Sequence, residues 1–279
     1  MDWSLENIVM EKSSAIRIIQ ITDLHTFANE ETKLLNISTN YTFYRVLEKV
    51  KEDLKKIKAD LMLVTGDLSQ DFSQKSYLRM KEILHNIEKE FKIPVAVTAG
   101  NHDDKELLNS TLTHFIKKDF SFQNWRVLVL NTEWPGHVAG MLPDDELNFL
   151  RTALTSSPEK SVLIFLHHQV LPTNSAWLNK IGLSNSQVFL DILSEHTNVK
   201  AVVSGHVHQQ NLEIQGNLVF YTTPSTCWQF ARNTAKFKLD SLMPGYRWFE
   251  LYDDGSYQTE VVRVPFDPAC IPDLESTGY

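Results

Sequence analysis

The sequence predicts an α/β fold, formed by a single domain over residues 1–279 whose sheet is mixed. Short β-rich apolar runs alternate with helical patterns over most of the chain. Two hairpin signals then follow between about residues 212 and 264. No linker rich in proline, glycine or serine divides the chain, although a separate small domain formed by the C-terminal hairpins is an alternative.

The elements of the first half follow from local spacing. Apolar residues at 43, 47, 50, 54 and 57 repeat with helical period, with Lys and Glu between them. Ser73 is a candidate N-cap for the next helix. We expect helices at about 43–57 and 73–89, and strands at 15–21, 61–65, 94–98 and 126–130.

The second half continues the alternation before the hairpins begin. Asp144 and Asp145 open a helix over 144–154, where acidic side chains suit the helix dipole. We expect strands at 161–166 and 199–204, a helix at 186–195, and hairpins pairing 212–214 with 218–222 and 248–252 with 257–264. The tail from Pro265 looks irregular.

Composition narrows the class of partner. Hydrophobic residues make up 42% of the chain and charged residues 22%, as in ordinary globular proteins. The net charge of −8 argues against a nucleic-acid binder, which needs a basic surface. Cys227 and Cys270 are too few for a disulfide framework or a cysteine-rich zinc module. Without a positively charged leader or an apolar run of about 18 residues, we expect a cytoplasmic protein with no membrane partner.

Histidines and carboxylates gather where five expected strands end. The segments are Asp23-Leu24-His25, Gly66-Asp67, Asn101-His102-Asp103, His167-His168 and Gly205-His206-Val207-His208. Taken singly, each is more typical of a turn, a helix cap, or a core or surface histidine. Ligand sites in α/β sheets form outside the carboxyl ends of strands, so the five together predict one site.

The residue types in this set predict metal chemistry. Imidazole and carboxylate together suit borderline divalent metals. One ion is saturated by three or four such groups, so about seven imply two ions that share a bridging carboxylate. Two ions about 3.5–4 Å apart activate water and stabilise a displacement at phosphorus. No sequence motif supports a serine hydrolase, a P-loop or a Rossmann nucleotide site.

In this order the segments resemble the motifs of the calcineurin-like metallophosphoesterase superfamily, D-x-H, G-D, G-N-H-[DE], H and G-H-x-H. A closer resemblance is to bacterial class III 3′,5′-cyclic-AMP phosphodiesterases. It rests on residues 66–71, 224–227, 229–230 and 244–247. The resemblance implies a four-layer α/β/β/α sandwich with mixed sheets and two divalent ions per chain, usually iron and manganese. It also implies hydrolysis of cyclic AMP to 5′-AMP by a hydroxide that bridges the ions.

The resemblance also implies a role for each motif residue. Asp23, His25 and His208 should hold the first metal, and Asn101, His167 and His206 the second, with Asp67 bridging both. His102 should be the catalytic proton donor to the leaving 3′-oxygen and should not bind metal. Residues implied in substrate binding are His25, Asp67, Asn101 and His102.

Some roles stay open at this stage. Relatives commonly follow the paired histidines with His-Pro or Pro-Pro, whereas this chain has Gln169-Val170, in a loop expected to contact product or solvent. Trp228 and Phe230 could stack on adenine or belong to the core. Asp71 could orient His102 or sit in a surface turn, and the role of His168 is open.

Other functions compete with the leading one. A glycerophosphodiesterase or a broad phosphodiesterase could use the same site, and some members of the superfamily are non-catalytic scaffolds. The net charge of −8 argues against a nuclease. His85, His114, His137 and His196 lie outside the motifs and are expected on the surface or on helix faces.

Overall fold

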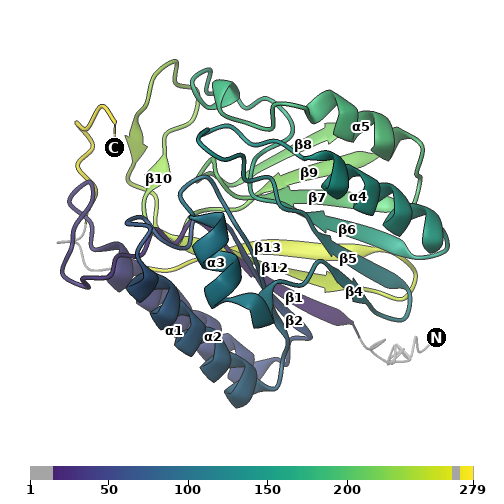
Figure 1. The fold of residues 1–279 in the computed structure, drawn as a ribbon, viewed down its shortest axis with the longest axis horizontal. Helices are drawn as coiled ribbons and strands as arrows, with labels where there is room; N and C mark the ends of the chain where they lie inside the picture. Colours follow the sequence, from purple (N-terminus) through teal and green to yellow (C-terminus); the bar gives the residue numbers. More distant parts are fainter. Residues whose placement is uncertain (1–14, 266–270, 279) are drawn as a thin grey trace, which may run out of the picture.

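Two mixed sheets pack face to face, and helices cover the outer side of each (Figure 1). This computed structural model describes residues 15–265 and 271–278. The first sheet has the order β13-β12-β1-β2-β3 and the second β4-β5-β6-β7-β9-β8. The layers are therefore helix, sheet, sheet and helix, as the resemblance implied.

Parallel pairing builds the centre of the first sheet. Its strands are β1 (Ile16–Ile21), β2 (Leu61–Thr65), β3 (Val95–Thr98), β12 (Gly245–Leu251) and β13 (Tyr257–Arg263). β1, β2 and β3 run parallel, whereas β12 pairs antiparallel with both β1 and β13. Its outer face is covered by α1 (Thr39–Lys56), α2 (Gln74–Phe91) and α3 (Lys105–Thr111).

The second sheet is built in the same way. Its strands are β4 (Asp119–Ser121), β5 (Trp125–Val129), β6 (Ser161–Phe165), β7 (Val199–Ser204), β8 (Asn211–Gln215) and β9 (Leu218–Thr222). β5, β6, β7 and β9 run parallel, and β4 and β8 are antiparallel edges. α4 (Asp144–Ser156) and α5 (Ser186–Ser194) cover its outer face.

Apolar side chains pack between each sheet and its helices and between the two sheets. Ile18, Leu63, Phe165 and Phe249 belong to the cluster between the two sheets, where all four are fully buried. Strands buried on both faces explain the continuous apolar runs in the sequence. Of the described residues, no helix combines the length and the apolar character that a bilayer crossing needs.

Most expected elements are present, with informative differences at their ends. Ser73 caps α2 by accepting a hydrogen bond from the Ser76 N–H, as predicted. α1 begins at Thr39 rather than at residue 43, because Ser38 caps it and its first turn is buried through polar side chains. Short elements that the sequence did not predict are α3, β4, β10 (Gln229–Phe230), β11 (Leu239–Asp240) and the 3-10 turns η1 (Thr113–Phe115) and η2 (Leu178–Lys180).

Candidate metal centre

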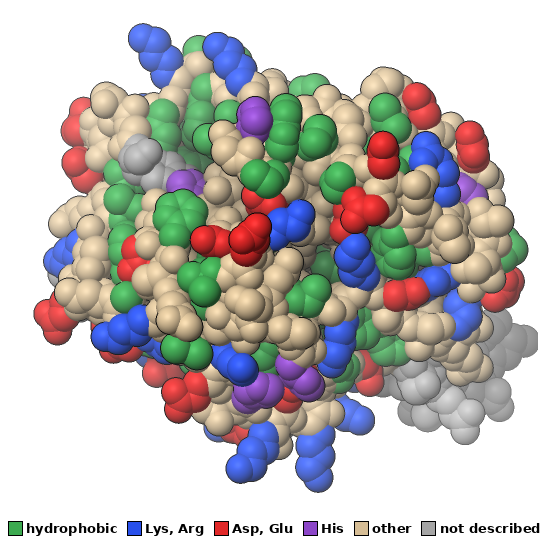
Figure 2. Space-filling model, viewed as in Figure 1, with side chains coloured by type: hydrophobic (Ala, Val, Ile, Leu, Met, Phe, Trp, Pro, Cys, Tyr) green, Lys and Arg blue, Asp and Glu red, His purple; other side chains and the backbone are tan. Residues whose placement is uncertain are grey.

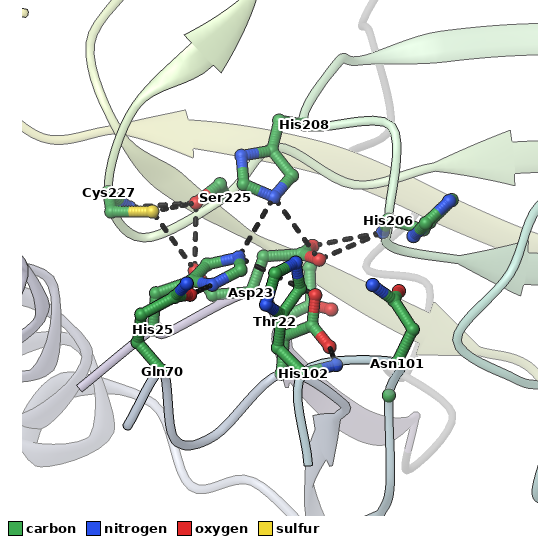
Figure 3. A network of polar contacts seen from close by, with 12 residues as sticks. Thr22, Asp23, His25, Gln70, Asn101, His102, His206, His208, Ser225 and Cys227 are labelled. Carbon is green, nitrogen blue, oxygen red and sulfur yellow. Dashed lines mark hydrogen bonds and ion pairs between the residues drawn. The ribbon is translucent and has the colours of Figure 1, made fainter. Parts of the chain in front are cut away.

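The five histidine and carboxylate segments meet where strands of both sheets end. Figure 3 shows side chains from several of them, such as Asp23, His102 and His208, close to one another. The segments follow β1, β2 and β3 of the first sheet and β6 and β7 of the second. Backbone hydrogen bonds join neighbouring segments, from Asp23 N–H to Gly66 C=O and from Gly205 N–H to His167 C=O. The Asp23 carboxylate joins the two sheets by accepting the His206 N–H at 3.0 Å. The segments therefore form one centre.

Backbone strain is concentrated in these segments. Five residues have a positive φ, Asp23, His25, Asp67, His206 and His208, among ten such non-glycine residues in the described chain. This left-handed region is costly for residues with a Cβ and persists only where the surroundings enforce it. Strain of this kind gathers at functional sites, where it fixes the direction of a side chain.

Two motif glycines let the segments approach one another. A Cβ on Gly100 would lie 2.2 Å from Asp67 Oδ1 and 2.7 Å from His167 Nε2. A Cβ on Gly205 would lie 2.1 Å from Thr22 Oγ1 and 2.7 Å from Asp23 Oδ2. Both positions need glycine because no side-chain atom fits there.

The first donor group brings together the residues expected to hold the first metal. One donor atom each from Asp23, His25, Asp67 and His208 lies within 4.8 Å of the others, and all four residues are buried. His208 Nε2 is 3.4 Å from Asp23 Oδ1 and 3.2 Å from His25 Nε2. Figure 3 shows His25 and His208 on the side of the centre opposite Asn101 and His206.

Hydrogen bonds on the far side of the rings set the tautomers of these histidines. His208 Nδ1–H donates to the Trp228 carbonyl at 2.9 Å, and His25 Nδ1–H donates to Gln70 Oε1 at 2.6 Å. In this tautomer each ring directs the lone pair of Nε2 inward. Two such lone pairs 3.2 Å apart repel each other unless a cation lies between them. This arrangement is typical of metal-binding histidines.

The second donor group forms around His167. Its Nδ1–H donates to the Thr65 carbonyl at 2.8 Å, and its Nε2 faces Asn101 Oδ1 at 3.3 Å. His206 Nε2 is buried and has no hydrogen-bond partner in the described structure. An orphaned buried nitrogen beside two further donors fits a second ion.

His168 is already satisfied by the protein. Its Nδ1 accepts from the Thr132 hydroxyl at 2.8 Å, and its Nε2–H donates to the Val138 carbonyl at 3.2 Å. The ring lies close to His206, with centroids 4.6 Å apart. With both nitrogens engaged, His168 is the poorer ligand and packs behind the second group.

Asp67 lies between the two groups. Its Oδ1 accepts the His102 N–H at 2.8 Å. Its Oδ2 is 3.5 Å from His25 Nε2 in the first group and 3.3 Å from His167 Nε2 in the second. A single carboxylate oxygen thus faces both groups.

Burial and the two carboxylates set the protonation of the centre. Burial lowers the pKa of His25 to about 3 and holds that of His206 well below its usual value. Burial alone would also lower the pKa of His167, but the Asp67 and Asp23 carboxylates and the Thr65 carbonyl together outweigh burial and raise it to about 9. Burial would raise the pKa of Asp67, and the nearby imidazoles, His167 foremost, hold it well below its usual range.

Metal binding near neutral pH should therefore release about one proton per chain, because His167 must lose a proton before Nε2 can bind an ion. Titration calorimetry in two buffers of different ionisation enthalpy measures this release. The release should fade as the pH rises through about 9. His167→Gln removes the titrating group and is the control. Equal proton release from both proteins at neutral pH would contradict the assignment.

His102 differs from the other histidines of the centre because it is partly exposed. Its ring lies edge-on to His25, with centroids 5.0 Å apart, and burial lowers its pKa.

Asp71 was a candidate to orient His102. In the structure its carboxylate accepts hydrogen bonds from the Ala28 and Ser73 N–H groups and from the Ser69 hydroxyl. Those contacts support the surface-turn interpretation of Asp71.

Trp228 and Phe230 form a buried wall behind the first donor group. They are 1% and 2% exposed, respectively. The Trp228 ring packs 4.8 Å from that of His25, and the Phe230 ring stacks on His208 at 4.5 Å. These contacts support the core interpretation over stacking on a nucleobase.

Trp228→Ala should therefore destabilise the fold by about 3–5 kcal/mol, as large core truncations do. Turnover of cyclic AMP and of bis(p-nitrophenyl) phosphate should fall by similar factors, because the change loosens the ring of His25 rather than a nucleoside pocket. Thermal melts and kcat/KM for both substrates measure this, with Trp228→Phe as the conservative control. A loss confined to cyclic AMP with an unchanged Tm would restore the stacking role.

Sequence reasoning missed two further residues of the centre. Cys227 lies far along the chain from the strand-end motifs, yet its Sγ is grouped with the donor atoms of His25 and His208 within 4.8 Å. Gln70 fixes the ring of His25. Gln70 lies within residues 66–71, one of the segments on which the family resemblance rests, and this position was the sequence signal that could have identified it. Cys270 lies outside the described residues.

The loop that carries Gln169-Val170 is partly buried and partly exposed. Both residues are buried, 3% and 7% exposed, and Gln169 Nε2 donates to the Leu178 carbonyl at 2.9 Å. The loop reaches solvent, as expected, at Pro172 and Asn174. Gln169 and Val170 themselves are buried because the loop folds back onto η2, and contact of the loop with product stays a prediction.

The fold and the donor set define an α/β/β/α protein with a buried histidine–carboxylate centre. Residues 16–210 match the model of the calcineurin-like phosphoesterase family. The chain belongs to the calcineurin-like phosphoesterase family, which is hydrolytic and metal-dependent. The predicted class, a metallophosphoesterase, is therefore confirmed.

Similar proteins cover nearly the whole chain. A 3′,5′-cyclic adenosine monophosphate phosphodiesterase, CpdA, from Haemophilus influenzae is 37% identical over 98% of both chains. CpdA from Pseudomonas aeruginosa is 36% identical over 95% of this chain and 96% of its own. The crystal structure of a dimetal phosphatase from Danio rerio has a TM-score of 0.58 at 16% identity, covering 90% of this chain and 99% of that one. That structure shows the fold alone.

Proposed function

We propose that this chain hydrolyses 3′,5′-cyclic AMP to 5′-AMP at a dinuclear metal centre. The observation that carries the proposal is Asp67 Oδ2, which faces His25 at 3.5 Å and His167 at 3.3 Å and so joins two donor groups. The names of the two CpdA relatives supply the substrate.

The residues present fit two divalent ions. Asp23, His25 and His208 would hold one, Asn101, His167 and His206 the other, and Asp67 both. A donor set of imidazole nitrogens with carboxylate and amide oxygens suits iron, manganese or zinc, and we propose iron and manganese. When bound, the ions would lower the pKa of a water that attacks phosphorus and would offset negative charge on the phosphoryl oxygens.

The chain's own residues orient this chemistry. The outer hydrogen bonds to Gln70, Thr65 and Trp228 fix the directions of three imidazoles before any ion binds. Asp67 Oδ1 accepts the His102 N–H and so fixes the backbone of the proton donor. Pre-positioning of this kind avoids reorganisation during the reaction.

His102 would donate a proton to the departing 3′-oxygen. Its ring is partly exposed and adjoins His25, at the boundary between the buried donors and solvent. Figure 3 shows it between His25 and Asn101, at the front of the centre. A ribose alkoxide is a poor leaving group, so proton transfer from a positioned imidazole helps the cleavage.

A substrate panel on metal-reconstituted enzyme tests the proposal. It includes cyclic AMP, cyclic GMP, 2′,3′-cyclic AMP, glycerophosphodiesters and bis(p-nitrophenyl) phosphate. Cyclic AMP should give the highest kcat/KM, with 5′-AMP as product. A preference for glycerophosphodiesters would favour the glycerophosphodiesterase alternative, and no turnover of any diester would favour the scaffold.

A further inference from the structure

A second group of metal-type donors lies on the surface, outside the histidine–carboxylate centre. His85 and Glu88 stand three residues apart on α2, so their side chains share a face, and His114 lies in η1. Glu88 Oε2 is 2.7 Å from His114 Nε2 and 3.8 Å from His85 Nδ1. In Figure 2 histidine side chains (purple) gather near the lower edge, over the region of α2 in Figure 1.

The three side chains are anchored by their surroundings. Both imidazole rings rest on Phe115, which is fully buried, with centroids 4.8 Å from its ring. Glu88 Oε1 accepts the Val95 N–H at 3.1 Å, which leaves Oε2 directed at the two histidines. α2, η1 and the start of β3 thus hold the donors in place together.

A simple ion pair accounts for only part of this arrangement. His114 alone would satisfy Glu88 Oε2, yet a second imidazole, 5.1 Å from the first, directs Nδ1 at the same oxygen. Each ring thus has a nitrogen close to the same carboxylate oxygen, as the ligands of one ion do. A shared cation satisfies all three donors.

We propose that His85, Glu88 and His114 bind a divalent transition metal of the zinc type, which links α2 to η1. One donor atom from each residue lies within 4.8 Å of the others. Two imidazoles and a carboxylate suit zinc, nickel or copper. The side chains are 45%, 19% and 49% exposed, so water would complete the coordination.

The bound metal would act as a clamp, which we define as the bridge between α2 and η1. It would hold the segment from His102 to η1, which carries part of the buried centre. η1 directly follows α3, whose N-cap, Asp104, comes two residues after His102. A metal bridge from η1 to α2 would tie this segment to the helix layer. The clamp uses none of the donors of the buried centre, so it stands or falls independently of the proposed hydrolysis.

Zinc uptake by the metal-loaded enzyme tests the clamp. The wild type is dialysed against zinc alongside His85→Ala, His114→Ala, Glu88→Gln and the control His137→Ala, and bound zinc is measured by elemental analysis. His137 is an exposed histidine that stacks on Trp134. Glu88→Gln can keep the bond to the Val95 N–H while it loses the charge. Exchange at the buried centre affects all five proteins alike, so the differences isolate the surface site.

The wild type and His137→Ala should each bind one more zinc ion per chain than the other three variants. Loss of an outer partner of a ligand costs about 10–100-fold in metal affinity, so loss of a ligand should weaken the surface site at least that much. Zinc should also raise the Tm of the wild type more than that of Glu88→Gln. Equal zinc content and equal Tm shifts in all five proteins would overturn the proposal.

Discussion

Asp67→Asn should lower bound metal from two ions per chain to fewer than one. The substitution keeps an oxygen for the His102 N–H but removes the charge that faces both His25 and His167. Loss of one outer partner costs about 10–100-fold in affinity, and Asp67 would serve two ions, so turnover of cyclic AMP at limiting metal should fall by about 10⁴.

Two comparisons make the result specific. His25→Ala removes a ligand of one ion only and should leave more metal bound than Asp67→Asn. Asp71→Asn changes a carboxylate of the same loop whose contacts are with Ala28, Ser69 and Ser73, so metal content should stay at two. Two metals per chain and normal turnover in Asp67→Asn would refute the bridging role.

His102→Ala should slow cyclic AMP hydrolysis by about 10²–10⁴, the usual contribution of a general acid. The loss on bis(p-nitrophenyl) phosphate should be clearly smaller, because p-nitrophenolate leaves without a proton. Metal content should not change, since His102 is outside both donor groups. Measuring kcat/KM on the two substrates, together with elemental analysis, separates these effects.

The pH dependence of the same variant gives a second check. Burial lowers the pKa of His102, so the protonated form is the minor form at neutral pH. The ratio of wild-type to variant turnover should therefore increase as the pH falls and shrink as it rises. Equal losses on both substrates, with a ratio that does not change with pH, would remove the general-acid role. Lost metal would make His102 a ligand instead.

The sequence predicted the strands that matter for the centre because each has a local signal. Buried runs such as residues 61–65 are continuous apolar segments that end in a polar motif. The number of sheets has no local signal, so the residue pattern alone indicated one mixed sheet, and only the family resemblance implied two. α3 was missed because seven residues are too few to show a helical period.

The candidate donors were predictable, whereas the groups that position them were not. Asp23, His25, Asp67 and His208 lie in short motifs, and the structure brings them together. Their supporting partners are largely backbone carbonyls, such as Thr65 and Trp228, which any residue type can provide. The positive φ at five motif residues also opposes local propensity and arises only in the assembled fold.

The dependence of 5′-AMP formation on bound metal tests the central claim most directly. Metal-free enzyme is titrated with manganese, and the rate of cyclic AMP hydrolysis is plotted against the metal bound per chain. We predict little turnover with a single ion and a maximum at two, because Asp67 joins two donor groups into one centre. Full turnover at one ion per chain, or no 5′-AMP at any metal content, would contradict the account.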